Sequence, residues 1–311
     1  MRAIRVHEFG DPEVLLLEEL PRPQPVADEV LVRVQAAGVN PFETYVRSGR
    51  YARLPALPYT PGVDAGGVLA ESGERVYASG SLSGTYAELA LCRRDQVHPL
   101  PDDLSYAQGA ALGVPYETAH RALQQRARAV SGETVLVHGA SGAVGLAAVQ
   151  FALAAGLLVV GTAGTEAGRE LIRNQGAALA FDHRDPLHLA AAVDATGGHG
   201  FDVIVELLAN VNLGDDLTAL AMRGRVVVVG SRDTVTVDPR DLMTVDGAVL
   251  GMMSNNASPE EIGETHAAIA AGLRSGSLHP VVAREYALAE AARAHHHVME
   301  RPALGKLVLV P

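Results

Sequence analysis

The pattern of hydrophobic and polar positions changes character after about the first hundred residues. Up to that point, short apolar runs are separated by Gly and Pro, as at 30–34, 66–70 and 74–78. Alternation of apolar and polar residues predicts half-buried strands, and turn residues at short spacing predict a small, irregular β-barrel. The segment 36–62, punctuated by Gly and Pro, is predicted to be a loop.

From about Pro115 the pattern becomes one of alternating strands and helices. Residues 116–130 have helical spacing, and continuous Val/Ile/Leu runs then alternate with helical segments. Strands without polar alternation are typical of a parallel sheet whose two faces are covered by helices. We predict strands at 135–137, 157–162, 203–207, 226–230 and 248–252, and helices at 144–155, 166–175, 213–221 and 259–273.

The last apolar run, at 306–310, is predicted to be a strand that returns to the first domain. Because a typical domain has about 100–200 residues, an α/β protein of two domains is expected. We expect a β-barrel domain made of residues 1–120 and 282–311. A doubly wound parallel-sheet domain, residues 121–281, is expected between these two parts.

Composition and charge narrow the classes of function. The 311 residues include 36 acidic and 25 basic side chains, which gives a net charge of −11. This charge repels phosphate backbones and anionic membranes, so nucleic acid is not expected as a main partner. Cys92 is the single cysteine, which excludes an intramolecular disulfide and a multi-cysteine metal site. Because no apolar run reaches about 18 residues and no signal-type segment is present, we expect no membrane span and a cytoplasmic protein.

The most informative stretch is the glycine-rich segment after the first predicted parallel strand. Gly139, Gly142 and Gly145 stand between that strand and a helix. In a dinucleotide-binding turn, the first glycine makes the sharp turn and the second lets backbone N–H groups approach a pyrophosphate. The third allows close packing of the helix on the strand. A βα turn without a ligand is the plainer alternative.

A second alternative is the nucleophile elbow of serine hydrolases. The segment centred on Ser141 approaches the pattern G-x-S-x-G, which also lies between a strand and a helix. The pattern ends in Ala143 instead of Gly, and the following Val144 and Gly145 suit a dinucleotide turn better. The sequence therefore favours cofactor binding over a serine nucleophile.

The end of the second parallel strand indicates which dinucleotide is bound. NAD-binding sheets place Asp or Glu near this point to hold the ribose 2′-OH. Here the strand runs into Gly164 and Thr165, and the first acid, Glu166, lies in the next helix. Without a nearby acid a 2′-phosphate is not repelled, and Arg232 and His183 are candidate counter-charges. The pattern favours NADPH over NADH.

Several longer motifs occur in order along nearly the whole chain, at 5–15, 37–49, 57–64, 137–142, 161–166, 206–213 and 228–232. They resemble the quinone oxidoreductase (zeta-crystallin-like) branch of the medium-chain dehydrogenase/reductase superfamily. The resemblance implies an N-terminal GroES-like β-barrel domain and a Rossmann domain, with NADPH bound in the cleft.

The resemblance also implies cofactor contacts at the matching positions of this chain. These are Tyr45, Ser141, Gly142, Ala143, Val144, Gly164, His183, Asn212, Val229, Gly230, Ser231, Arg232, Met252, Met253 and Ser254. Ala143 departs from the glycine of the family and places a methyl group beside the pyrophosphate. The side chains at 252–254 also differ, although their backbone can serve the nicotinamide equally.

The same resemblance also indicates whether the protein binds a metal ion. Zinc-dependent relatives hold a catalytic zinc with Cys and His ligands. This chain has Asn40 at the position of the cysteine, and it has Gly62-Val63-Asp64 where those relatives carry Gly-His-Glu. No metal is therefore expected. Zinc polarises an alcohol for hydride removal, whereas a quinone or an activated alkene already accepts hydride through its conjugated carbonyl.

Four polar side chains of one segment are the candidate catalytic residues. Asn40 is the candidate amide donor to the acceptor carbonyl, and Tyr45 is a candidate contact to cofactor or substrate. Tyr51 and Tyr59 are candidates to stack on a flat ring, and either phenol is a candidate proton donor. Plainer alternatives stay open: the tyrosines can line a domain interface, and Asn40 before Pro41 can be turn chemistry.

One histidine run, 295–297, invites a metal interpretation. Consecutive helical residues point about 100° apart, so these side chains cannot chelate one ion together. A solvated helix face is expected instead.

Together, these observations predict an NADPH-dependent quinone oxidoreductase that transfers hydride to a quinone or related conjugated carbonyl without zinc. An NADPH-dependent alkenal/enone double-bond reductase on the same scaffold is an alternative. A crystallin-like or RNA-binding role is an alternative of another class, and the net charge of −11 opposes RNA binding. The apolar strand 248–252 lies at the expected sheet edge, so a homodimer through this Rossmann-domain edge strand is predicted.

Overall fold

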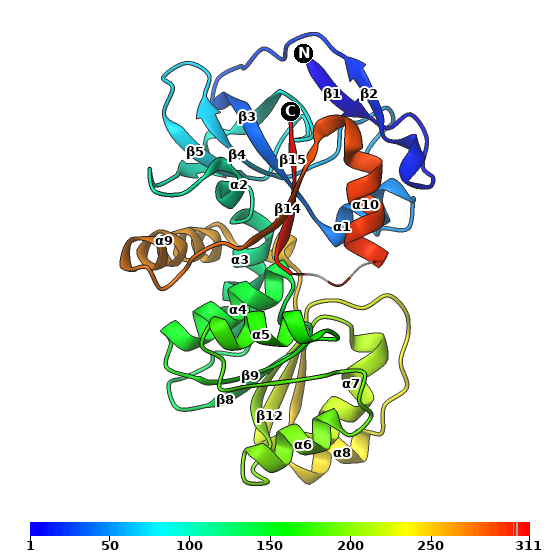
Figure 1. Cartoon of the computed structure of the whole chain (residues 1–311), viewed down its shortest axis with the longest axis vertical. Coiled ribbons are helices and arrows are strands. Elements are labelled where there is room, and N and C mark those ends of the chain that lie inside the picture. The colour runs from blue at the N-terminus through cyan, green and yellow to red at the C-terminus, as the bar shows by residue number, and fades with distance from the viewer. Residues whose placement is uncertain (301, 303) are drawn as a thin grey trace. The chain divides into compact units, whose positions relative to one another are not determined.

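The computed structural model describes residues 1–300, 302 and 304–311. The chain divides into two compact units (Figure 1). The first unit comprises Met1–Val114 and Pro280–Pro311, and the second comprises Pro115–His279. The sequence predicts the boundaries between the two domains at 120/121 and 281/282. In the structure the first boundary falls within helix α3, Gly113–His120.

The first unit is built on a seven-stranded, mostly antiparallel sheet with the order β14-β15-β3-β4-β5-β7, in which β6 also pairs with β3. Its strands are β3 (Glu29–Val39), β4 (Asp64–Leu69), β5 (Arg75–Ser79), β6 (Leu89–Arg93), β7 (Val97–Pro99), β14 (Val282–Ala287) and β15 (Lys306–Val310). A separate hairpin, β1 (Arg2–Arg5) and β2 (Leu16–Glu19), joins it through a bridge between Ala3 and Ala87. The core between these strands is largely aliphatic. This is the barrel of a GroES-like domain.

The return of the tail to the first domain is confirmed. Strand β15 pairs antiparallel with β3, with Leu309 opposite Ala37, and parallel with β14 (Figure 1). Leu309 is fully buried. The C-terminal segment therefore completes the same sheet that the N-terminal part of the chain begins.

The prediction of a loop over 36–62 is wrong in its first part. Strand β3 continues to Val39, and helix α1, Pro41–Arg47, begins directly after it. Asn40 is the N-cap residue: its backbone N–H donates to Glu43 Oε2 at 2.8 Å, which forms part of a capping box. Pro41 at the first helical position needs no hydrogen bond to its nitrogen. Local capping chemistry thus starts a helix where Gly and Pro elsewhere in the segment indicated a loop.

The second unit contains a six-stranded parallel sheet with the order β10-β9-β8-β11-β12-β13. Its strands are β8 (Thr134–Val137), β9 (Leu158–Thr162), β10 (Leu179–Phe181), β11 (Phe201–Glu206), β12 (Leu220–Val228) and β13 (Ala248–Gly251). Numbered within this unit, the order is 3-2-1-4-5-6, the doubly wound order of the Rossmann fold. The predicted fold class is therefore confirmed for both units.

Helices flank this sheet on its two faces (Figure 1). They are α4 (Ala143–Ala154), α5 (Glu166–Asn174), α6 (His188–Ala195), α7 (Ala209–Thr218) and α8 (Pro239–Thr244), and the unit also contains α9 (Pro259–Ser275). Because crossovers between parallel strands are right-handed, reversing the direction of strand addition after β10 moves the helices to the other face. The predicted helix 213–221 is wrong at its end, since β12 already begins at Leu220.

Two further helices and a π-helical turn are also present. Helix α2 (Tyr106–Gly109) and helix α10 (Ala291–Glu300) belong to the first unit, and Arg121–Arg126 forms the π-helical turn after α3. Among the described residues, none of the helices combines the length and the apolar character that crossing a membrane would need.

Candidate functional site

The glycine-rich turn between β8 and α4 has the backbone that an anion cradle needs. Gly139 has φ of +56°, in the left-handed region that favours glycine, and Gly142 is the N-cap of α4. A Cβ on Gly145 would lie 2.5 Å from the Cα of Ala140, so only glycine lets α4 pack this closely on the strand end. The N-terminus of α4 thus offers backbone N–H groups and a partial positive charge. These residues fit the pyrophosphate of a dinucleotide.

Ser141 does not have the partners of a nucleophile. Its side chain is buried and lies against α5, where a Cβ on Gly168 would come within 3.1 Å of Ser141 Oγ. Within the described part of the chain, no histidine is hydrogen-bonded to it, so the base that a serine hydrolase requires is lacking. The geometry therefore favours the dinucleotide turn over the nucleophile elbow.

The predicted cofactor residues of the later strands gather at the carboxyl edge of the sheet. Val229 N–H donates to the carbonyl of Glu206 at 2.9 Å, and Ala209 N–H donates to the carbonyl of Gly230 at 2.8 Å. These bonds join the ends of β11 and β12 to the start of α7, which carries Asn212. Ligands of open parallel sheets bind at this edge.

Three further predicted positions continue along the same edge. Met252 N–H donates to the carbonyl of Val228 at 3.0 Å, which extends the pairing of β13 with β12. Met253 is exposed, and the Ser254 hydroxyl lies 3.1 Å from that of Thr118. Ser231 Oγ donates to the carbonyl of Asp233. The backbone of this segment is thus fixed while its side chains remain partly accessible.

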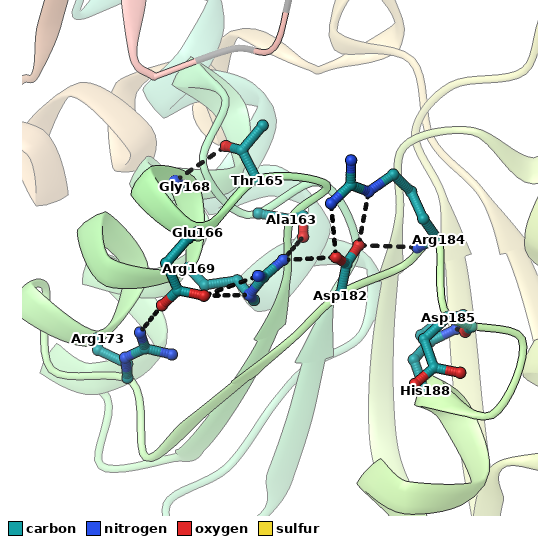
Figure 2. Close-up of polar contacts among 10 residues, drawn as sticks. All are labelled: Ala163, Thr165, Glu166, Gly168, Arg169, Arg173, Asp182, Arg184, Asp185 and His188. Atoms are coloured by element: carbon teal, nitrogen blue, oxygen red, sulfur yellow. Dashed lines mark hydrogen bonds and ion pairs between the residues drawn. The ribbon is translucent and has the colours of Figure 1, made fainter.

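Arginine and acid side chains form a network where β9 and β10 end (Figure 2). Arg169 Nη1 lies 2.8 Å from Asp182 Oδ2, and its Nη2 lies 2.7 Å from Glu166 Oε2. Arg184 bonds both oxygens of Asp182, at 3.0 and 2.7 Å. Arg173 Nη2 bonds the second oxygen of Glu166 at 2.6 Å. The flanking arginines hold the pKa of Asp182 well below its usual range.

This network changes the electrostatics expected at the end of β9. Glu166, the acid nearest the strand end, is paired with two arginines, so it is not free to bind a ribose hydroxyl. Three guanidinium groups and two carboxylates make up the network, and the carboxylates of Glu170 and Asp185 stand next to it in the sequence. Neither Arg169 nor Arg184 was a candidate from the sequence. Their signals were present: Arg169 follows Glu166 by three residues in the first turn of a helix, and Arg184 follows His183 directly.

The two counter-charge candidates from the sequence have different surroundings. His183 lies against Gly164, where an added Cβ would be 2.7 Å from His183 Nε2, so the structure brings these two together. Arg232 is exposed, and its backbone N–H donates to Asn210 Oδ1 at 2.9 Å. Asp185 follows Arg184 directly and forms a local turn with His188, whose Nδ1 lies 2.7 Å from the carbonyl of Asp185 (Figure 2).

A buried polar cluster lies behind the glycine-rich turn. His138 Nε2 is 2.7 Å from Asp216 Oδ1 and 3.6 Å from Glu206 Oε2, and all three side chains are buried. Burial raises the pKa of both carboxyl groups to about 7 and lowers the pKa of His138. Within the described residues, this is the set that could offer three ligand atoms to one metal ion. Because Nε2 already bonds Asp216 and the cluster is closed to solvent, a proton-sharing network is the better description.

In the first unit, Asn40 belongs to a buried ion-pair network. Its Oδ1 accepts from the Lys306 ammonium at 2.6 Å, and its Nδ2 donates to Asp64 Oδ2 at 2.9 Å and to Glu43 Oε1 at 3.3 Å. The ammonium also bonds Asp64 Oδ2 at 2.7 Å. Both amide hydrogens of Asn40 are engaged, and the side chain is 2% exposed. We therefore correct its expected role: Asn40 fixes the start of α1 and has no free hydrogen for a substrate carbonyl.

Lys306 is a residue that the sequence analysis missed, although a signal existed. It is the only lysine among 25 basic residues. A compact ammonium fits where a planar guanidinium does not, and the space is narrow: a Cβ on Gly38 would lie 2.6 Å from Lys306 Cε.

The network extends inward from Asn40. Glu43 Oε2 accepts from the Tyr86 hydroxyl at 2.7 Å, and that hydroxyl lies 3.1 Å from His295 Nε2. Burial raises the pKa of Glu43 to about 7 and lowers that of His295 to about 3. The expectation of a solvated helix face at 295–297 is therefore wrong for His295, which is buried because it satisfies Tyr86 inside the barrel.

The three candidate tyrosines are separated by the structure. Tyr45 lies on α1, and Tyr51 packs on Phe42 of the same helix with ring centroids 5.8 Å apart. Tyr59 packs inward against the barrel core, where its hydroxyl is buried without a partner among the described residues. Burial raises the pKa of Tyr59 to about 12, so its phenol is a poor proton donor. We therefore correct the expectation for Tyr59: it is a packing residue.

Comparison with known proteins places both units in one class. Residues 26–102 match the model of the alcohol dehydrogenase GroES-like domain, and residues 143–271 match the model described as zinc-binding dehydrogenase. These are the two parts of a medium-chain dehydrogenase/reductase.

Relatives within this class are similar over their full length. The human quinone oxidoreductase is 46% identical over 100% of this chain and 98% of that protein. The structure of the quinone oxidoreductase from Thermus thermophilus, described with its NADPH complex, has a TM-score of 0.91 at 32% identity and full coverage of both chains. A structure described as an NAD-dependent alcohol dehydrogenase has a TM-score of 0.92 at 27% identity and full coverage of both chains. The chain belongs to the quinone oxidoreductase family.

The ion pair of Lys306 generates a prediction about stability. Replacing Lys306 with Met leaves the buried carboxylate of Asp64 without its counter-charge, which is expected to lower the free energy of unfolding by about 3–5 kcal/mol. Denaturant unfolding followed by circular dichroism measures the change. Arg22→Met, which removes an exposed cation, is the matched control and is expected to change stability by less than about 0.5 kcal/mol. Equal stability of the two variants would contradict the assignment.

Proposed function

We propose that this protein is an NADPH-dependent, zinc-independent reductase of quinones or related conjugated carbonyls. The observation that supports this most strongly is the ammonium of Lys306 between Asn40 and Asp64. These two residues stand in segments where zinc-dependent relatives carry a cysteine ligand and a Gly-His-Glu sequence. Here a fixed cation and an amide occupy these segments, so the residues do not suit a thiolate–imidazole zinc site.

The second unit would bind the cofactor through its backbone and its arginines. NADPH supplies a hydride when it is bound. The N-terminus of α4 would hold the pyrophosphate, and the edge formed by Val229, Gly230 and Asn212 would hold the nicotinamide half. Because a protein with the same fold is described as NAD-dependent, the choice of cofactor depends on the residues at the end of β9. Arg169 and Arg184 there favour a 2′-phosphate.

The first unit would contribute the surface for the acceptor. A quinone carbonyl is conjugated, so it needs orientation and a proton, not Lewis-acid activation. Tyr45 and Tyr51 lie on or against α1, whose start is fixed by Asn40. We propose that these two aromatic side chains contact the flat acceptor. An enone reductase would use the same residues, and therefore remains the second candidate.

Acceptor specificity distinguishes these candidates directly. We expect rapid oxidation of NADPH, followed by its absorbance, with 1,2- and 1,4-quinones, and slower oxidation with an enone. An aldehyde is expected to be inert because it lacks conjugation, and NADH serves as the cofactor control. Faster turnover of the enone than of every quinone would replace the proposal by the double-bond reductase. Binding of NADPH without turnover of any acceptor would contradict both enzymes.

Cofactor preference is expected to depend on Arg184. Removing its guanidinium by Arg184→Ala is expected to raise KM for NADPH about 10-fold, because one charge-assisted hydrogen bond to the phosphate is lost. KM for NADH is expected to stay within about 2-fold, since NADH has no 2′-phosphate. Arg173→Ala is the matched control, because Arg173 pairs with Glu166 further along α5. An equal effect of Arg184→Ala on both cofactors would contradict this assignment.

We also propose a homodimer formed through β13. This strand ends the described sheet order, and Val249 is 39% exposed on it. An uncovered apolar edge strand favours pairing with a second copy. Light scattering at micromolar concentration is expected to give the mass of a dimer, and Val249→Lys is expected to give a monomer. Leu158→Lys, at an exposed position of β9, should leave the dimer intact. A wild-type monomer would refute the proposal.

A further inference from the structure

Buried polar groups connect the ends of three neighbouring strands in the second unit. His138 follows β8, Thr162 ends β9 and Glu206 ends β11, all at the carboxyl edge of the sheet. Gly139 N–H donates to Thr162 Oγ1 at 3.2 Å, and His138 Nδ1 lies 3.5 Å from the same oxygen. Glu206, at the centre of this network, has 0% exposure. The glycine-rich turn and the start of α7 are therefore joined through side chains beneath the edge.

One carboxyl oxygen of Glu206 accepts two hydrogen bonds. One donor lies on α7, and the other is the residue just before this helix. Glu206 Oε1 accepts from the backbone N–H of Leu208 and, at 3.2 Å, from Asn212 Nδ2. The Asn212 amide therefore presents its NH₂ side to this oxygen. Asn212 Oδ1 is then directed away from Glu206. Asn212 is half-buried on α7, at the edge where the predicted cofactor residues gather.

The second carboxyl oxygen of Glu206 accounts for the stability of this fully buried acid. Glu206 Oε2 and Asp216 Oδ2 are buried, and neither has a donor among the described residues. One carboxylate oxygen of each residue and a ring nitrogen of His138 all lie within 4.8 Å of one another. One proton shared between Oε2 and Oδ2 satisfies both atoms, while Asp216 Oδ1 accepts from His138. Glu206 Oε1 then remains an acceptor for Asn212.

We propose that Glu206 is a positioning residue of the cofactor site that orients the amide of Asn212. Its acceptor oxygen presents Asn212 Oδ1 to a donor group of the ligand. That group is a ribose hydroxyl or a carboxamide NH₂, since a phosphate would offer only acceptors. The identity of the ligand as NADPH rests on the proposed function, whereas the orientation of Asn212 does not.

Two substitutions of Glu206 separate positioning from packing. Glu206→Gln keeps an oxygen for Leu208 and Asn212 and places an NH₂ where the shared proton stands, so NADPH affinity is expected to stay within about 2-fold. Glu206→Met keeps the volume but removes the acceptor, so the dissociation constant for NADPH, measured by fluorescence titration, is expected to rise about 10-fold. Equal losses in the two variants would overturn the proposal.

A double-mutant cycle tests whether Glu206 acts through Asn212. Asn212→Ala alone is expected to weaken NADPH binding about 10-fold. In the Glu206→Met background, the same substitution is expected to have less than about 2-fold further effect, because the oriented amide is already lost. Multiplication of the two losses to about 100-fold would mean independent action and would overturn the proposal.

A measurement without cofactor keeps the test independent of the proposed function. In the NMR spectrum of the ligand-free protein, the Asn212 side-chain NH₂ signal can be assigned by its loss in Asn212→Asp. We expect these protons to exchange slowly with solvent in the wild type and in Glu206→Gln, compared with the exposed Asn255. Exchange as fast as that of Asn255 would overturn the proposal, even if Glu206→Met does not fold. Slow exchange without NADPH binding would instead refute the proposed cofactor.

Discussion

The buried ammonium of Lys306 is the interaction on which the first unit depends most. It joins β15 at the C-terminus to Asn40 and Asp64, and Asn40 in turn caps α1 through Glu43. Asp64 Oδ1 also accepts the backbone N–H of Val114 at 2.9 Å, so the same carboxylate reaches the end of the unit's first segment. A charge pair with 1% and 0% exposure tolerates no missing partner. The start of α1, and hence the place of Tyr45, follows from this pair.

In the second unit, backbone geometry and side-chain charge contribute separately to the proposed binding of a dinucleotide. The glycine-rich turn brings the N-terminus of α4 to the edge of the sheet, where it can hold an anion whatever the nucleotide. In our proposal, Arg169 and Arg184 at the ends of β9 and β10 then distinguish one dinucleotide from another. The chain carries a net charge of −11, and the arginines of this edge are paired with Glu166 and Asp182.

The fold and the outline of the cofactor site could be predicted because they depend on local patterns. Continuous apolar runs identified the parallel strands, and the spacing of Gly139, Gly142 and Gly145 identified the turn. The residues that the prediction missed act through long-range contacts. Lys306 meets Asn40 across 266 residues of sequence, and no local pattern shows such a pair.

Burial was the second property that the sequence did not reveal. Tyr59 and His295 have polar side chains and stand in segments that suggested exposure, yet both point into the barrel. Asn40 was a candidate donor to the substrate, but its amide bonds Lys306, Asp64 and Glu43 within the protein. In each case the hydrogen-bond partners determine the role, and these partners lie on other strands or helices.

We propose that quinone reduction by this protein needs no zinc, because a fixed ammonium and an amide stand where zinc-dependent relatives bind metal. The most direct test is to measure metal content and NADPH–quinone turnover on the same chelator-treated sample. The account predicts full turnover with less than about one zinc per ten chains, and no gain when zinc is added back. Turnover that falls with the zinc content and returns in proportion to added zinc would contradict it.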